Sequence, residues 1–124
     1  MTFAALRSLG LAVAATILLG TVSARAEEHK VTIDNFTFAP AQLTVKIGDT
    51  VTWTNHDDIP HTVVSAGKYR SKTMDTDGTF SFTFTSVGDY KYFCSLHPHM
   101  TGMIKVEAQT TGMIQPDQGT NKVE

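Results

Sequence analysis

Hydrophobic and polar positions alternate in several short segments between Glu28 and Ala108. The sharpest alternation is Thr79–Thr85, which places three Phe on one side and hydroxyl groups on the other. Leu43–Ile47 follows the same two-residue period. This period is the pattern of a β-strand with one buried face. Clusters of Gly, Asp, Asn and Pro separate the segments, so the stretch is typical of an all-β sandwich.

We expect about seven to eight short strands in this stretch, because no window there has a helical apolar period. The segments with the strongest strand pattern are Val31–Ile33, Leu43–Ile47, Thr50–Thr54, His61–Val64, Thr79–Thr85, Tyr90–Cys94 and Gly102–Glu107. A core of roughly 80 residues is only marginally stable by itself. Such a small domain is often stabilised by a bound metal ion.

The N-terminal residues 1–26 have the pattern of a secretory signal peptide. Arg7 precedes an apolar run from Leu9 to Leu19, and Ala24-Arg25-Ala26 has the small-x-small pattern of a cleavage site. The run is too short for a membrane anchor, since a spanning helix needs about 20 apolar residues. We therefore expect cleavage after Ala26 and a periplasmic protein without a stable membrane anchor.

The mature chain is expected to consist of a domain over residues 27–108 and a loose polar tail over residues 109–124. The full chain of 124 residues has 10 basic and 12 acidic side chains, and cleavage removes Arg7 and Arg25. The mature chain then has 8 basic and 12 acidic side chains, a net charge of −4 with His neutral. A mildly acidic chain without a basic run is a poor candidate for binding nucleic acid. We expect a monomer.

Cys94 is the only cysteine of the chain. In a secreted protein an unpaired cysteine indicates an intermolecular disulfide, a reactive thiol or a metal ligand. The surrounding segment Phe93–Met100 favours the third interpretation, because it holds a thiol, two imidazoles and a thioether within eight positions. Two His, one Cys and a weak axial Met are the ligands of a blue-copper electron-transfer site.

The candidate ligands from this segment are Cys94, His97 and Met100, and the second His must come from elsewhere. His61 is well placed, because it follows Pro60 and opens a predicted strand. Zinc is the competing metal, but zinc prefers several Cys or His and does not take Met, so copper is favoured. The remaining histidines are interpreted as surface residues; they are His29, His56 and His99.

The stretch from about Val31 to Glu107 resembles the cupredoxins, and among them the amicyanin type. The matching segments are Gly48–Asn55, Ile59-Pro60-His61, Phe82–Thr85, Gly88–Tyr92 and the short ligand loop, with two residues between Cys94 and His97 and two between His97 and Met100. The resemblance implies a Greek-key β-sandwich that binds one copper ion. It places His61, Cys94 and His97 in a trigonal plane, with Met100 as the distant axial ligand.

The resemblance also implies function. Thr62 stands where this family often has Asn, and its hydroxyl is expected to tie the two ligand loops together, although with shorter reach. The expected role is a one-electron carrier and not an enzyme, since the ligand set leaves no open position on the metal. Expected partners are a c-type cytochrome or a periplasmic dehydrogenase such as methylamine dehydrogenase. The alternative is a periplasmic copper carrier that binds and delivers the ion.

Overall fold

The computed structural model describes residues 10, 14–17, 20 and 25–109. Most of the predicted signal peptide and all of the predicted tail after Gln109 lie outside the described residues, so these two assignments stay predictions. Within the described part of the chain, no helix has the length and apolar character needed to cross a membrane.

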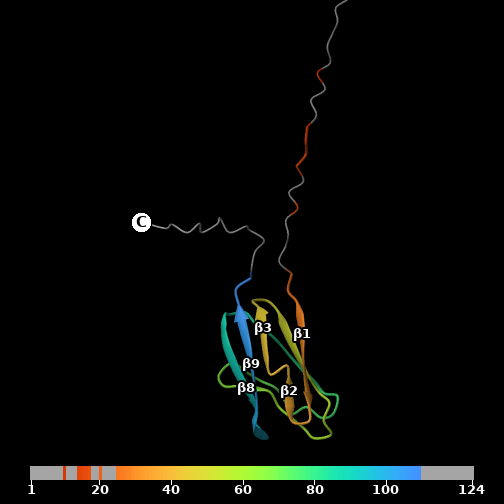
Figure 1. Ribbon diagram of the computed structural model, residues 1–124, viewed down its shortest axis with the longest axis vertical. Helices are drawn as coiled ribbons and strands as arrows, with labels where there is room; N and C mark the ends of the chain where they lie inside the picture. The colour runs from red at the N-terminus through yellow and green to blue at the C-terminus, as the bar shows by residue number, and fades with distance from the viewer. Residues whose placement is uncertain (1–9, 11–13, 18–19, 21–24, 110–124) are drawn as a thin grey trace, which may run out of the picture.

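The described residues form a sandwich of two β-sheets, which confirms the predicted fold class (Figure 1). One sheet has the strand order β2-β1-β4-β7, and the other has the order β3-β9-β8-β5-β6. The strands are β1 (Glu28–Asp34), β2 (Thr37–Ala39), β3 (Gln42–Lys46), β4 (Thr50–Asn55), β5 (Val64–Ser65), β6 (Tyr69–Arg70), β7 (Thr79–Thr83), β8 (Gly88–Cys94) and β9 (His97–Glu107). The pairs β1–β4 and β3–β9 are parallel, and the other pairs are antiparallel.

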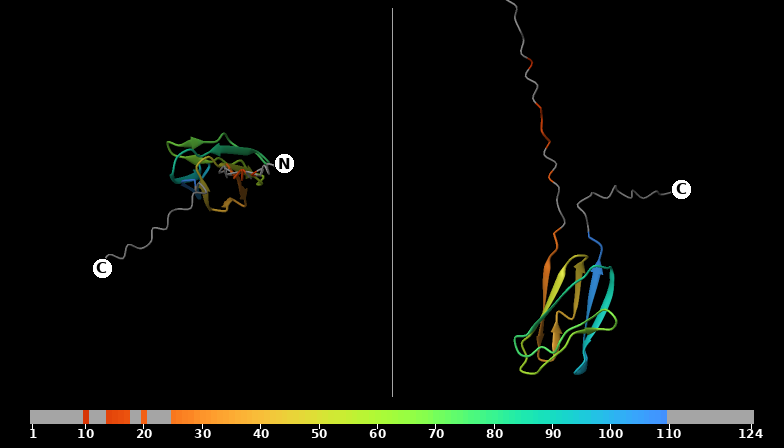
Figure 2. Two further views of the ribbon diagram at one scale, coloured as in Figure 1. Left: turned by 90° about the horizontal axis from the view of Figure 1, so that it is seen from above. Right: turned by 180° about the vertical axis from the view of Figure 1, so that it is seen from behind.

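The core fills the space between the two sheets, which face each other in Figure 2. It contains the aromatic side chains of Phe38, Trp53, Phe84 and Tyr92, each at most 2% exposed. Burial of these large side chains is the main favourable contribution to folding. They hold the sheets in the position that brings the connecting loops together at one end.

The alternating segment Thr79–Thr85 behaves largely as predicted. Its hydroxyl groups pair with those of the neighbouring strand β4: Thr83 with Thr50 and Ser81 with Thr52, each at 2.7 Å between hydroxyl oxygens. The strand ends at Thr83, because the Phe84 amide donates to the Asp49 carbonyl and no longer to β4.

The predicted strand His61–Val64 is wrong for its first three residues. The regular strand is only Val64–Ser65, whereas His61 forms an isolated bridge with Met74. The pattern of hydrophobic and polar positions also did not predict the short strands β2 and β6 or the turn at Asn35 and Phe36. Both residues of this turn have positive φ. These elements of two or three residues are too short to show a period.

Gly102 is required by the packing of Tyr92. The two residues are opposite each other in β8 and β9, and a Cβ at position 102 would lie 2.3 Å from the Tyr92 ring. Because Tyr92 is 2% exposed, its ring has no space into which it can move.

We expect Gly102→Ala to lower the free energy of unfolding by about 1–3 kcal/mol, the usual cost of overpacking a core. Urea unfolding of the copper-free protein measures this change without a contribution from bound metal. Lys105→Ala, at an exposed position of the same strand, is the control. Equal stability of both variants would show that Tyr92 can move aside.

Candidate metal centre

Cys94 and His97 lie at the tip of the hairpin formed by β8 and β9. Cys94 is the last residue of β8 and pairs with His97, the first residue of β9. The regular register is interrupted between Phe93 and Cys94, because Phe93 pairs with Thr101. The extra residues of β9 form a bulge, a feature that redirects side chains next to many functional sites.

His61 reaches the hairpin from the connection between β4 and β5. Its backbone is fixed by two hydrogen bonds to Met74: the His61 amide donates to the Met74 carbonyl at 3.1 Å, and the Met74 amide donates back at 2.9 Å. The residue is fully buried. The fold thus positions this side chain through backbone contacts that lie outside any regular strand.

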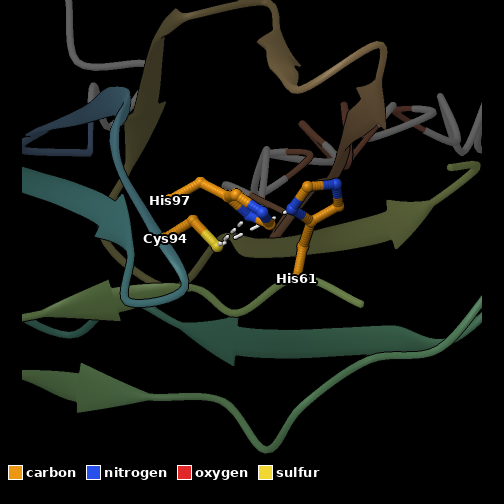
Figure 3. Close-up of side chains that lie close together, drawn as sticks. All are labelled: His61, Cys94 and His97. Atoms are coloured by element: carbon orange, nitrogen blue, oxygen red, sulfur yellow. Dashed lines mark hydrogen bonds between the residues drawn. The ribbon is translucent and has the colours of Figure 1, made fainter. Parts of the chain in front are cut away.

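The three predicted strong ligands converge on one point, as Figure 3 shows. The Cys94 Sγ atom lies 3.7 Å from His61 Nδ1 and 3.7 Å from His97 Nδ1. Two donors that bind one ion at about 2.2 Å and 120° lie about 3.8 Å apart. The donor positions therefore fit a single metal ion held by one thiolate and two imidazoles.

Met100, the predicted axial ligand, is a buried residue of β9. Its side chain is 4% exposed and belongs to the core between the sheets. Met100 and Cys94 both belong to the β8–β9 hairpin, and both are buried. This position is compatible with the predicted role.

Thr62 joins the two loops that carry the candidate ligands. Its amide donates to Cys94 Sγ at 3.3 Å, and its hydroxyl oxygen accepts from the Ser95 amide at 2.8 Å. The same hydroxyl lies 2.8 Å from the Ser95 hydroxyl. The structure thus bears out the expectation that Thr62 ties the loops together.

Asp57 is a functional residue that sequence reasoning missed. Its Oδ2 lies 2.8 Å from His61 Nε2, the ring nitrogen opposite the one that faces Cys94. It also accepts the amides of Asn35 and Phe36. Burial disfavours the charged form, but these hydrogen bonds outweigh it and hold the pKa of Asp57 below its usual range. The only indication of this contact in the sequence is that an acidic residue stands four positions before His61.

Phe36 is a second residue that the sequence did not indicate. Its ring meets the rings of His61 and His97 edge-on, with centroid distances of 5.3 and 5.0 Å. The side chain is nevertheless 43% exposed. It therefore covers the two imidazoles and forms part of the surface above them.

The surroundings of Cys94 stabilise its thiolate. Burial disfavours the charged sulfur, but the Thr62 amide, the ring nitrogens of His61 and His97 and the Leu96 amide outweigh this effect. Together they lower the pKa of Cys94 to about 6. A thiolate is the form of cysteine that binds metals, so the site is prepared for an ion at neutral pH.

Two of the three histidines that were interpreted as surface residues are exposed, namely His56 and His99. The interpretation is wrong for His29, whose side chain is 22% exposed and whose Nε2 lies 2.9 Å from Asp49 Oδ2. The partner of His29 lies 20 positions away, and only the parallel pairing of β1 with β4 brings it near.

A two-sheet sandwich with a thiolate, two imidazoles and a thioether at one end defines a class of small metalloproteins with mixed sulfur and nitrogen ligands. The family model of the cupredoxin-like domain matches residues 7–106. The chain therefore belongs to the cupredoxin family.

Its relatives include amicyanins and plastocyanins. The amicyanin of Paracoccus denitrificans is 36% identical, over 62% of this chain and 63% of its own length. Amicyanin-alpha of Methylorubrum extorquens is 33% identical, over 77% of this chain and 86% of its own length. The plastocyanin of Nostoc punctiforme is 32% identical, over 84% of this chain and 96% of its own length.

Solved structures agree with these relatives. A methionine-to-alanine variant of amicyanin with Cu(I) has a TM-score of 0.62 and 34% identity, over 64% of this chain and 82% of that chain. This chain spans 61% and 63% of the length of the two Paracoccus amicyanins. Cupredoxins of this type bind one type 1 copper ion, and His61, Cys94, His97 and Met100 form a typical ligand set for it.

Asp57→Asn is expected to weaken copper binding about 10- to 100-fold, the usual effect of losing a carboxylate that orients a ligating His. It should also raise the reduction potential, because a negative charge near the site stabilises Cu(II) over Cu(I). Chelator competition and protein electrochemistry measure the two effects. Asp58→Asn, which changes an exposed neighbour, is the control. Unchanged affinity and potential would limit Asp57 to holding the Asn35–Phe36 turn.

The low pKa of Cys94 predicts a pH dependence of stability in the copper-free protein. The folded thiol has a pKa of about 6, whereas an unfolded thiol has a pKa of about 8.5. Between these values the unfolded state binds more protons, so the free energy of unfolding should rise from pH about 6 to about 8.5. Below about 6 this contribution is lost. Urea unfolding of the copper-free protein and of Cys94→Ala across this pH range measures this contribution. If the free energy of unfolding depends on pH in the same way in both proteins, the low pKa of Cys94 is contradicted.

Proposed function

We propose that this protein is a blue-copper one-electron carrier that exchanges electrons with periplasmic redox partners. The observation that carries the proposal is the convergence of a buried thiolate and two imidazoles at the end of a cupredoxin sandwich. His61, Cys94 and His97 would hold the ion in the trigonal plane, with Met100 as the axial ligand. Copper in this ligand set changes between Cu(I) and Cu(II).

The protein's own residues keep the site rigid and closed. The Thr62 bonds fix Cys94 relative to the His61 loop, and Asp57 fixes the His61 ring. Four protein ligands leave no coordination position for a substrate, and a catalytic metal needs such a position. The arrangement supports electron transfer rather than catalysis.

An apolar surface above the site suits brief contacts with partners. Of the large exposed hydrophobic residues among residues 25–109, three belong to segments that carry or cover the site: Phe36, Ile59 and Leu96. His97 is partly exposed, and its ring contacts that of Phe36. We propose that electrons pass through the His97 ring, and that this apolar rim of Phe36, Ile59 and Leu96 makes the small interface typical of transient redox encounters.

The remaining assignments follow from the sequence. We propose cleavage of the signal peptide after Ala26, a cupredoxin domain over residues 27–108 and a polar tail over residues 109–124. The amicyanin relatives favour a c-type cytochrome or a periplasmic dehydrogenase as partner. Copper delivery is the alternative function, and it requires a site that releases its ion readily.

The protein loaded with Cu(II) should show an intense blue absorption band, because thiolate-to-copper charge transfer gives type 1 sites their colour. Cys94→Ala should lose the band completely. Met100→Leu is the control, since it removes no thiolate and should stay blue. A colourless wild-type protein would mean that the three strong ligands do not bind copper together.

Electron exchange between two copies of the protein tests the role of the apolar rim. We expect Leu96→Lys to slow self-exchange about tenfold or more, because two like charges would meet at the contact. Nuclear magnetic resonance line broadening in mixtures of both redox states measures the rate. Val87→Lys is the matched control, because Val87 is 58% exposed outside the rim. Slow exchange in the wild type combined with rapid copper loss to a chelator would favour copper delivery.

A further inference from the structure

A second group of metal-ligating side chains lies at the other end of the sandwich. Glu27, His29 and Asp49 each place one ligand atom within 4.8 Å of the others. The group lies where β1 begins and β9 ends, at the top of Figure 1. The register of β1 with β4 runs from Glu28–Thr50 to Ile33–Asn55, so the group is separated from the copper centre by roughly 17 Å of strand.

Two of the three distances in this group are close to those between neighbouring ligands on one ion, and the third is longer. His29 Nε2 lies 2.9 Å from Asp49 Oδ2 and 4.0 Å from Glu27 Oε2. The Glu27 backbone nitrogen lies 2.9 Å from Asp49 Oδ1. Neighbouring ligand atoms on an ion at about 2.1 Å are about 3 Å apart.

The charges of the group favour a cation. Within residues 25–109, the only side chain that pairs with either the Glu27 or the Asp49 carboxylate is that of His29. Two carboxylates thus share one imidazole, so with a neutral His29 the group is net negative even when the Glu27 nitrogen of the processed chain is a protonated amine. Asp49 is 2% exposed and cannot turn toward solvent, whereas Glu27 is 73% exposed and leaves the group accessible to an ion.

Cleavage after Ala26 would add a fourth ligand. Glu27 would become the first residue, and its backbone nitrogen, now an amide beside Asp49, would become a primary amine. Amine, imidazole and two carboxylates form a nitrogen and oxygen set that suits Cu(II) in tetragonal geometry, unlike the sulfur-rich set around Cys94. The ion would replace the protons that join Asp49 to the Glu27 nitrogen and to the His29 ring.

We propose that the processed protein binds a second divalent transition-metal ion through the Glu27 amine and carboxylate, His29 and Asp49. The inference rests on the proposed cleavage after Ala26, but not on electron transfer. It gives the protein two metal sites of different chemistry, one at each end of the β1–β4 pair.

The test uses protein secreted through its own leader, with the start at Glu27 established by intact mass. After one equivalent of copper has filled the blue site, a second equivalent of Cu(II) is added and followed by electron paramagnetic resonance. We expect a second signal with the large hyperfine splitting of tetragonal copper. His29→Gln should weaken this second binding at least about tenfold, since even loss of a residue that only supports a ligand costs about 10- to 100-fold.

His56→Gln is the matched control, because His56 pairs with Asp77 at 3.7 Å and belongs to no group of three ligand atoms among the described residues. It should leave the second signal unchanged. A protein that retains Ala26 before Glu27 should bind the second ion more weakly, because its Glu27 nitrogen stays an amide. Absence of a second signal, an equal signal in His29→Gln, or a chain that starts elsewhere than Glu27 would overturn the inference. Failure of the proposed function appears separately, as a missing blue band.

Discussion

The hydrogen bonds between Thr62 and the Cys94–Ser95 segment are the contacts on which the metal centre depends. They join two loops that are 32 positions apart in the chain and that belong to different connections of the sandwich. Without them the Cys94 sulfur would be a buried group with fewer donors to support its charge. Burial opposes a thiolate, and the Thr62 amide is the first of the donors that outweigh this effect and lower the pKa of Cys94.

The sequence predicted the sandwich and the candidate ligands Cys94, His97 and Met100 because these patterns are local, whereas His61 was assigned from its place before a predicted strand and from the family resemblance. Alternation in Thr79–Thr85 indicates a strand without knowledge of its partner, and the spacing from Cys94 to Met100 fits one short loop. Asp57, Phe36 and the bulge after Phe93 were not predicted. Their roles arise from contacts across the fold: Asp57 holds the Asn35–Phe36 turn more than 20 positions away.

His29 is a residue that the sequence analysis interpreted as solvated but that the fold places beside a buried carboxylate. A histidine in a polar N-terminal stretch has the composition of a solvated residue, and the sequence alone favoured that interpretation. Parallel pairing of β1 with β4 instead places it beside Asp49, a residue that looks like an ordinary turn aspartate after Gly48. Parallel partners are distant in sequence, so their cross-strand contacts cannot be read from local patterns.

The β1–β4 pair explains how one small domain can carry two different polar clusters without losing its core. Between the ends of the pair, Val31, Ile33, Val51 and Trp53 are all at most 1% exposed. The buried polar side chains of this pair lie next to the start of β4, at Asp49, and at its end, at Asn55. The apolar middle separates the two clusters, so a charge or ion at one end is screened by distance from the other. An ion at Glu27 should therefore hold the first residues of β1 in place while the electronic properties of the Cys94 site stay those set by Thr62 and Asp57.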